Sequence, residues 1–200
     1  MALSKTDLLN LSLGHLGTRT TVENIETEVS VEAVQGNLWY DTAREQALAE
    51  FDWGFARTRL ALASHGDAVP GEWLYRYQHP GDCVAPRRII NPAGSEEDDP
   101  PYKIFRSADG TRSIVTDVDD AVLIYTRNET DITLFTPHFI VAFTYLMASF
   151  LAPALTRKTE KKANMTSMYL GSILVAGAQE GNQETDRTPR DAEHIRYRTG

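Results

Sequence analysis

Apolar residues at the start of the chain recur with the period of a helix. Three leucines fall on one face at three- or four-residue spacing: Leu9, Leu13 and Leu16. Ser4 and Asp7 precede most of this run and stand three residues apart, an arrangement in which each side chain caps the other residue's backbone N–H. Gly17 stands where the helix would end, because glycine accepts the left-handed backbone of a C-terminal cap. The pattern predicts a first helix between Ser4 and Gly17.

A second helix is predicted from Ser30, a further N-cap residue, to about Phe51. It carries apolar residues on two faces instead of one. The first face holds Val31, Val34, Leu38 and Leu48, and the second holds Trp39, Ala43, Ala47 and Phe51. Two apolar faces require two packing partners. We expect one partner to be the subunit's own core and the other, contacted through Trp39, Ala43 and Ala47, to be a neighbouring copy.

The pattern changes to short β-prone runs in the middle of the chain, where Gly, Pro and Asp separate the apolar stretches. The predicted strands cover residues 55–62, 73–77, 102–106 and 121–126. Asp109-Gly110 precedes a further apolar pair, Ile114-Val115, and predicts a hairpin because it tolerates the positive φ angles of a tight turn. The simplest arrangement is one small antiparallel sheet, with an exposed loop at 91–101.

The run Trp73-Leu-Tyr-Arg-Tyr77 carries aromatic residues at alternate positions. Side chains at alternate positions of a strand point to the same side. Trp73, Tyr75 and Tyr77 are therefore expected to share one face, and we expect that face to pack inside the β region.

The last third of the chain returns to a helical pattern. Thr136-Pro137 is an N-cap followed by proline in the first turn, where its missing N–H costs nothing. No Asp, Glu, Lys or Arg occurs from Ile132 to Thr156. A membrane span shares this composition, but polar residues interrupt the run, Pro153 would break its end, and no second span is present. A central helix surrounded by protein is favoured, followed by a final helix from about Thr159 to Gly181.

These elements predict an α+β fold that is mainly α. We expect an antiparallel helical bundle with an inserted small antiparallel β region and an extended C-terminal tail. The bundle would be one discontinuous domain made of 1–52 and 132–181, with the β region at 53–131. Residues 182–200 would form the tail, because they hold too few apolar residues to build a core.

Composition narrows the functional classes. The chain has 200 residues and a net charge of −8, from 28 acidic and 20 basic residues. Its general surface is not expected to bind nucleic acid, since phosphate attracts the opposite balance of charge, although a local basic patch stays compatible with it. A single cysteine, Cys83, excludes an intramolecular disulfide. Met1 to Lys5 lacks the basic start and apolar core of a signal peptide, which predicts folding in the cytoplasm.

The sequence shows no recognisable catalytic or metal-binding motif. The five histidines show no metal-ligand spacing, and His79 near Cys83 has no third orienting group. Asp117, Asp119 and Asp120 form the best carboxylate cluster, but the glycine and glutamate of a calcium loop are missing from the required positions. A turn between strands is the simpler interpretation. We expect no catalysis, no metal and no cofactor.

Four motifs occur in a familiar order along the chain. They are Leu13-Gly-His-Leu-Gly17, then Ala43-Arg-Glu-Gln-Ala-Leu48 leading into Phe51-Asp-Trp-Gly-Phe55, then Trp73-Leu-Tyr-Arg-Tyr-Gln-His-Pro-Gly-Asp-Cys83, and finally Leu134-Phe-Thr-Pro-His-Phe139. This order resembles the tail tubular protein A family, the head-to-tail adaptors of short-tailed bacteriophages. The resemblance covers about residues 4 to 180, and its most specific part is the aromatic stretch from Tyr75 to Cys83.

The resemblance implies a homo-oligomer, a ring of twelve copies beneath the portal protein and above the tail nozzle protein. Such a ring belongs to the virion, retains packaged DNA and passes it through a central channel during ejection, without sequence-specific binding. Whether tail fibres attach to it stays open. Twelve copies of a chain at −8 would carry a charge on the order of −100, which would discourage DNA from adhering to the channel wall.

The tail residues Ile195, Arg196, Tyr197 and Arg198 are expected to bind the portal. Apolar anchors and arginines come close together in this short segment, as in peptides that become ordered on a partner. In the adaptors that this chain resembles, the C-terminal extension reaches up along the portal.

Two other functional classes stay open. A phage-borne cell-wall hydrolase would need a particular acidic pair, and the sequence offers no preferred one. A small DNA-binding virion protein would need a basic stripe. The basic runs, Arg57 with Arg59 and Arg157-Lys158 with Lys161-Lys162, are short.

Overall fold

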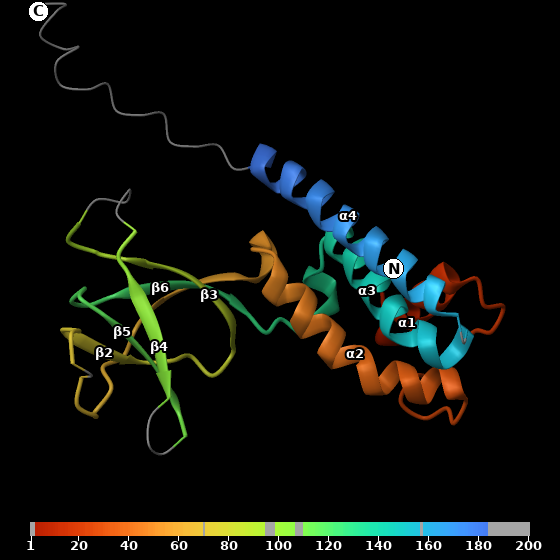
Figure 1. Ribbon diagram of the computed structural model, residues 1–200, viewed down its shortest axis with the longest axis horizontal. Coiled ribbons are helices and arrows are strands. Elements are labelled where there is room, and N and C mark those ends of the chain that lie inside the picture. Colours follow the sequence, from red (N-terminus) through yellow and green to blue (C-terminus); the bar gives the residue numbers. More distant parts are fainter. Residues whose placement is uncertain (1–2, 70, 95–98, 107–109, 157, 184–200) are drawn as a thin grey trace, which may run out of the picture.

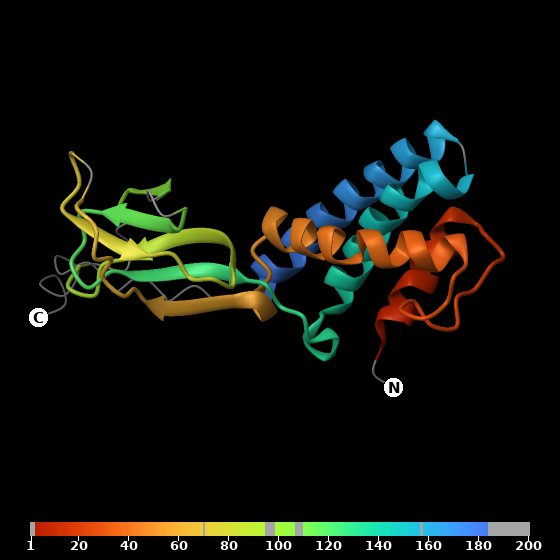
Figure 2. The same ribbon diagram turned by 90° about the horizontal axis from the view of Figure 1, so that it is seen from below.

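The computed structural model describes residues 3–69, 71–94, 99–106, 110–156 and 158–183. Within these residues the chain forms four α-helices and six strands, divided into a helical region and a β region that lie side by side (Figures 1 and 2). The predicted α+β class is confirmed.

The helical region contains α1 (Lys5–Leu16), α2 (Val31–Glu50), α3 (Pro137–Thr156) and α4 (Thr159–Gln183). α1 begins with the expected reciprocal cap: Asp7 N donates to Ser4 Oγ at 3.1 Å, and Ser4 N donates to Asp7 Oδ2 at 2.9 Å. It ends at Gly17, whose φ of +69° lies in the left-handed region. α4 ends at Gln183, two residues beyond its predicted end at about Gly181.

α3 is the central helix of this region and packs against α1, α2 and α4. Its residues Phe139, Phe143 and Met147 are fully buried. It is also the one helix in the described part of the chain whose length and composition would allow it to cross a membrane. Burial by the other helices accounts for its lack of charges. Pro153 lies inside α3, which continues to Thr156, so the expected break at this proline does not occur.

The β region consists of two three-stranded antiparallel sheets, where a single sheet was expected. One sheet has the order β1-β6-β3, with β1 at Arg57–Ala61, β6 at Val122–Arg127 and β3 at Cys83–Ile90. The other has the order β2-β5-β4, with β2 at Tyr75–Gln78, β5 at Arg112–Thr116 and β4 at Tyr102–Arg106. The pairing of Ile104 with Ile114 confirms the predicted hairpin, although Asp109 of its turn lies outside the described residues.

A small core combines residues of both sheets, among them Tyr77, Ile114 and Leu123. The Tyr75 and Tyr77 rings stack with centroids 6.4 Å apart, so these two residues share one face as predicted. Trp73 precedes β2 and is not part of the strand, so the expected alternation does not extend to it.

The helical and β regions have separate apolar cores. The helical core draws on residues between 8 and 56 and between 135 and 176, whereas the β core draws on residues between 62 and 125. Arg87 of β3 links the two regions. Its Nη2 donates to three carbonyls at the end of α2, those of Leu48 (3.0 Å), Ala49 (3.1 Å) and Phe51 (2.6 Å). These carbonyls have no partner within the helix, so one guanidinium both caps α2 and attaches β3 to it.

Candidate interaction surfaces

Cys83 and His79, the nucleophile and base considered from the sequence, provide no activated thiolate. The Cys83 thiol is buried at the start of β3, and this burial, reinforced by Asp82, raises its pKa to about 11. His79 Nδ1 donates to the Pro80 carbonyl at 2.9 Å, and burial lowers the pKa of this imidazole. A thiol with a raised pKa holds little thiolate at neutral pH.

The acidic cluster after β5 shapes a turn. Asp117 Oδ1 accepts from the backbone N–H of Leu74 at 3.0 Å, and Asp119 Oδ1 accepts from that of Asp120 at 3.0 Å. Asp120 has a φ of +49°, in the left-handed region that aspartate tolerates better than most residues. Among the described residues, no three His, Cys, Asp or Glu side chains gather as a metal-binding group.

The face of α2 that was assigned to a neighbouring copy lies mostly inside the subunit. Ala43 and Ala47 have no exposed surface and belong to the helical core. Trp39 is half-buried against Phe150, with ring centroids 5.2 Å apart. The assignment of Ala43 and Ala47 to a subunit interface must therefore be corrected. Small side chains allow helices to approach closely, so alanines at four-residue spacing mark the packing of α2 on α3.

Another face of α2 is open to solvent. Val31, Val34 and Leu38 have 61%, 52% and 63% of their surface exposed, and their spacing places them in one row along the helix. We call these three residues the α2 stripe. Leu48, which was predicted on the same face, is buried in the helical core.

A second apolar row lies on α4. Leu170, Leu174 and Val175 have 55%, 76% and 55% of their surface exposed, and we call them the α4 stripe. Sequence reasoning did not single out Leu170 or Leu174. The signal was present, because the consecutive residues Ile173, Leu174 and Val175 cannot all face one side of a helix.

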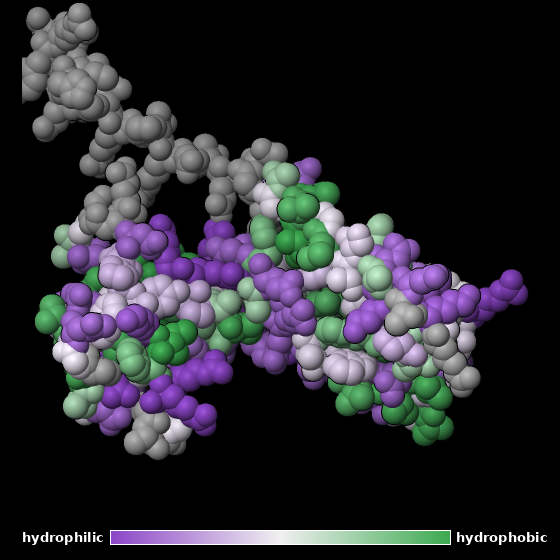
Figure 3. Space-filling model, viewed as in Figure 1, coloured by the Kyte–Doolittle hydropathy of each residue, from purple (hydrophilic) through white to green (hydrophobic). Residues whose placement is uncertain are grey.

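The two stripes lie on opposite sides of the helical region. α3 contacts both α2 and α4, and the two outer helices flank it in Figure 1. In Figure 3, apolar surface gathers at the upper edge over the C-terminal part of α4 and at the lower edge over the N-terminal part of α2. The chain therefore has two separate apolar surfaces, each turned away from the helical core.

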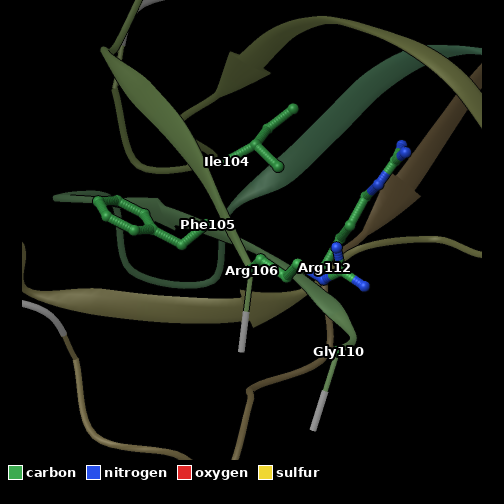
Figure 4. Close-up of a pocket in the computed structure, with 5 residues that line it drawn as sticks. All are labelled: Ile104, Phe105, Arg106, Gly110 and Arg112. Carbon is green, nitrogen blue, oxygen red and sulfur yellow. The ribbon is translucent and has the colours of Figure 1, made fainter. Parts of the chain in front are cut away.

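An open pocket of about 410 Å³ lies beside the β4–β5 hairpin (Figure 4). The described residues that line it are Ile104, Phe105, Arg106, Gly110 and Arg112. Arg106 and Arg112 are directly opposite each other in the hairpin, and both are exposed. The described lining residues offer positive charge and include no acid or nucleophile for catalysis.

The predicted portal-binding residues Ile195, Arg196, Tyr197 and Arg198 lie outside the described residues. Their role stays a prediction.

No protein-family model matches this chain, and a search of curated proteins finds no match either. The resemblance to tail tubular protein A therefore rests on the motifs in the sequence.

Proposed function

We propose that this chain is the subunit of a head-to-tail adaptor ring in a short-tailed bacteriophage. Twelve copies form the ring between the portal and the tail nozzle, around a channel that retains DNA and passes it during ejection. In this proposal the four helices act as an antiparallel bundle that carries the β region as an insertion, and the C-terminal tail reaches the portal. The protein works as a structural part of the virion and not as an enzyme.

The observation that carries this proposal is the pair of apolar stripes on opposite sides of the helical region. Contiguous exposed apolar surface on a folded chain commonly marks an interaction site. A two-fold dimer needs one self-complementary surface, whereas two different surfaces suit a head-to-tail contact, which forms a ring when its rotation closes. We assign the α2 stripe of one copy to the α4 stripe of the next.

The experiment that tests the proposal is a mass measurement of the purified protein, alone and mixed with its portal protein. We expect a complex with twelve adaptor subunits per portal. A monomer in the absence of portal is compatible with the proposal, because the portal can act as the template for the ring. Absence of a twelvefold complex on the portal would overturn the proposal.

A further inference from the structure

The β1-β6-β3 sheet has one face toward the β core and one face turned away from it. Leu123 and Tyr125 of β6 belong to the β core. Because successive side chains of a strand point to opposite sides, Ile124 and Thr126 project from the other face. We call this second face the outer face of the sheet.

Two arginines of β1 and two of β3 project from the outer face. Arg59 and Arg88 lie opposite the same residue of β6, Ile124, from its two sides. Arg57 is paired with Thr126, the next outward residue of β6. Arg87 Nε donates to Thr126 Oγ1 at 2.8 Å. We call these four side chains the arginine face.

The charge of the arginine face is only partly neutralised. Asp52 pairs with Arg57 at 3.1 Å and with Arg87 at 3.8 Å. Arg59 and Arg88 are exposed and form no ion pair within the described part of the chain. Arg59 and Arg88 therefore bring two exposed positive charges to this face, in a chain whose total is −8.

We propose that the arginine face binds the phosphate backbone of double-stranded DNA. Guanidinium groups match phosphate in charge and in hydrogen-bond geometry. Alternate residues of a strand lie about 7 Å apart, and β1 and β3, on either side of β6, lie about 10 Å apart. The face is therefore wide enough to meet more than one phosphate, and it requires no base recognition.

The remaining residues of the outer face favour duplex DNA over other partners. They are Ala61, Ala85, Ile90, Val122, Ile124 and Thr126, of which Ile90 and Thr126 are buried. None of them is aromatic, whereas binding of single strands relies on aromatic side chains that stack with bases. None is a Trp or Tyr, the apolar anchors most enriched at the centre of protein interfaces. Backbone binding needs only the charges.

This inference rests on the sheet itself and does not require the ring. In a ring around DNA, the same face repeated in each copy would hold the duplex at several points without reading its sequence. The acidic surface of the chain would then repel DNA, and the arginine face would contact the DNA at this sheet.

The test measures binding of a short duplex of mixed sequence to the full-length protein by fluorescence anisotropy, over a series of salt concentrations. The variant Arg59→Glu/Arg88→Glu should weaken binding about tenfold or more, and the slope of log K against log salt should become shallower by about 2. Both side chains are exposed, so the melting temperature should not change. Arg106→Glu/Arg112→Glu is the control, because it alters net charge equally on the other sheet.

Three outcomes would overturn the proposal. The first is a wild-type protein that does not bind the duplex at low salt. The second is an equal loss in both double variants, which would assign binding to net charge alone. The third is tighter binding to polyglutamate than to the duplex, which would assign the face to an acidic protein. Ring formation on the portal should be unaffected by Arg59→Glu/Arg88→Glu, so failure here is distinguishable from failure of the adaptor proposal.

Discussion

At the scale of single residues, Arg87 and Arg88 are neighbours on β3 with different roles. Arg87 caps α2 and also donates to Thr126, whereas Arg88 points to solvent. Replacing Arg87 with Met should lower the free energy of unfolding by on the order of 2–4 kcal/mol, because part-buried carbonyls at the end of α2 lose their donor and Asp52 loses one of its two arginine partners. Arg88→Met, the matched control, should change it by no more than about 0.5 kcal/mol.

Urea denaturation of both variants measures the difference. Arg87→Lys should not restore stability, because one ammonium group cannot serve both Thr126 and the end of α2. Equal stability of Arg87→Met and Arg88→Met would contradict the capping role.

The two tyrosines of β2 differ in burial and should differ in energetic weight. Tyr77 is 5% exposed and donates to the Val118 carbonyl at 2.8 Å, while Tyr75 is half-buried beside it. Tyr77→Ala should cost about 3–5 kcal/mol, and Tyr75→Ala should cost less but still lower the melting temperature clearly. Thermal unfolding checks the order. If Tyr75→Ala leaves the melting temperature unchanged but abolishes assembly, Tyr75 belongs to an interface.

Local interactions made much of the residue scale predictable. The cap between Ser4 and Asp7 and the end of α1 at Gly17 depend on residues a few positions apart, so the sequence alone indicates them. The roles of Arg87 and Tyr77 were not predicted. Their partners lie about forty positions away, and only the folded sheets bring them together.

At the scale of elements, replacing each of two helix glycines with alanine should change stability in opposite directions. A Cβ on Gly36 of α2 would lie 2.6 Å from Leu9 Cδ2, in the helical core, whereas a Cβ on Gly14 of α1 would meet nothing within 4 Å. Gly14→Ala should therefore stabilise the protein by about 0.5–1 kcal/mol through helix propensity. Gly36→Ala should destabilise it by about 1–3 kcal/mol, because overpacking outweighs propensity.

Denaturation curves of both variants check these signs. Adding Leu9→Val to Gly36→Ala should recover part of the loss, since the shorter side chain makes room. Stabilisation by Gly36→Ala alone would mean that α1 and α2 pack less closely than described.

The two stripes should be needed for assembly and not for folding. Leu38→Glu on α2 and Leu174→Glu on α4 alter exposed positions, so each should change stability by about 0.5 kcal/mol or less. Each should also prevent ring formation on the portal, because it places a charge in an apolar contact. Asn37→Glu and Gln179→Glu, at exposed polar positions of the same helices that face away from Leu38 and Leu174, are the controls.

A mixture of Leu38→Glu and Leu174→Glu distinguishes the kind of contact. Head-to-tail contact leaves one intact interface between unlike variants, so they should form pairs that cannot close into a ring. A complete ring from either variant alone would show that the stripes are not the contact.

Element prediction succeeded where the pattern was local and failed where pairing was distant. All four helices and the β4–β5 hairpin follow from short-range periodicity and turn residues. β3 was missed because Pro86, Arg87 and Arg88 interrupt its apolar pattern, and the strand has register shifts against β6. The division into two sheets was also missed, since β1 pairs with β6, at the other end of the β region.

At the scale of the whole molecule, charge is distributed in a way that composition does not reveal. Arg57 and Arg59 form only a short basic run in the sequence, and the net charge of −8 argues against DNA binding over the general surface while leaving a local basic patch open. β6 lies between β1 and β3 and brings Arg88 across from Arg59. A surface that joins distant segments cannot be recognised before the strand order is known.

The C-terminal tail should act on assembly alone. α4 ends at Gln183, so deletion of 184–200 removes no described element and should leave the melting temperature unchanged. If Ile195 to Arg198 bind the portal, the deletion should weaken attachment strongly, because a weak contact repeated around a ring gains from multivalency. Sedimentation with the portal measures attachment, with the full-length chain as control. Unchanged ring formation would show the tail to be dispensable.

The position of α3 also affects how the protein is made. α1 and α2 leave the ribosome first, but the helix that covers their apolar faces follows the entire β region in the chain. At about 5–20 residues per second, the interval between the completion of α2 and that of α3 is on the order of 10 s. The β core can close during this interval, because its residues are contiguous, while the apolar surface of α1 that packs on α3 is still exposed. We therefore expect the nascent chain to be more prone to aggregation than the folded chain.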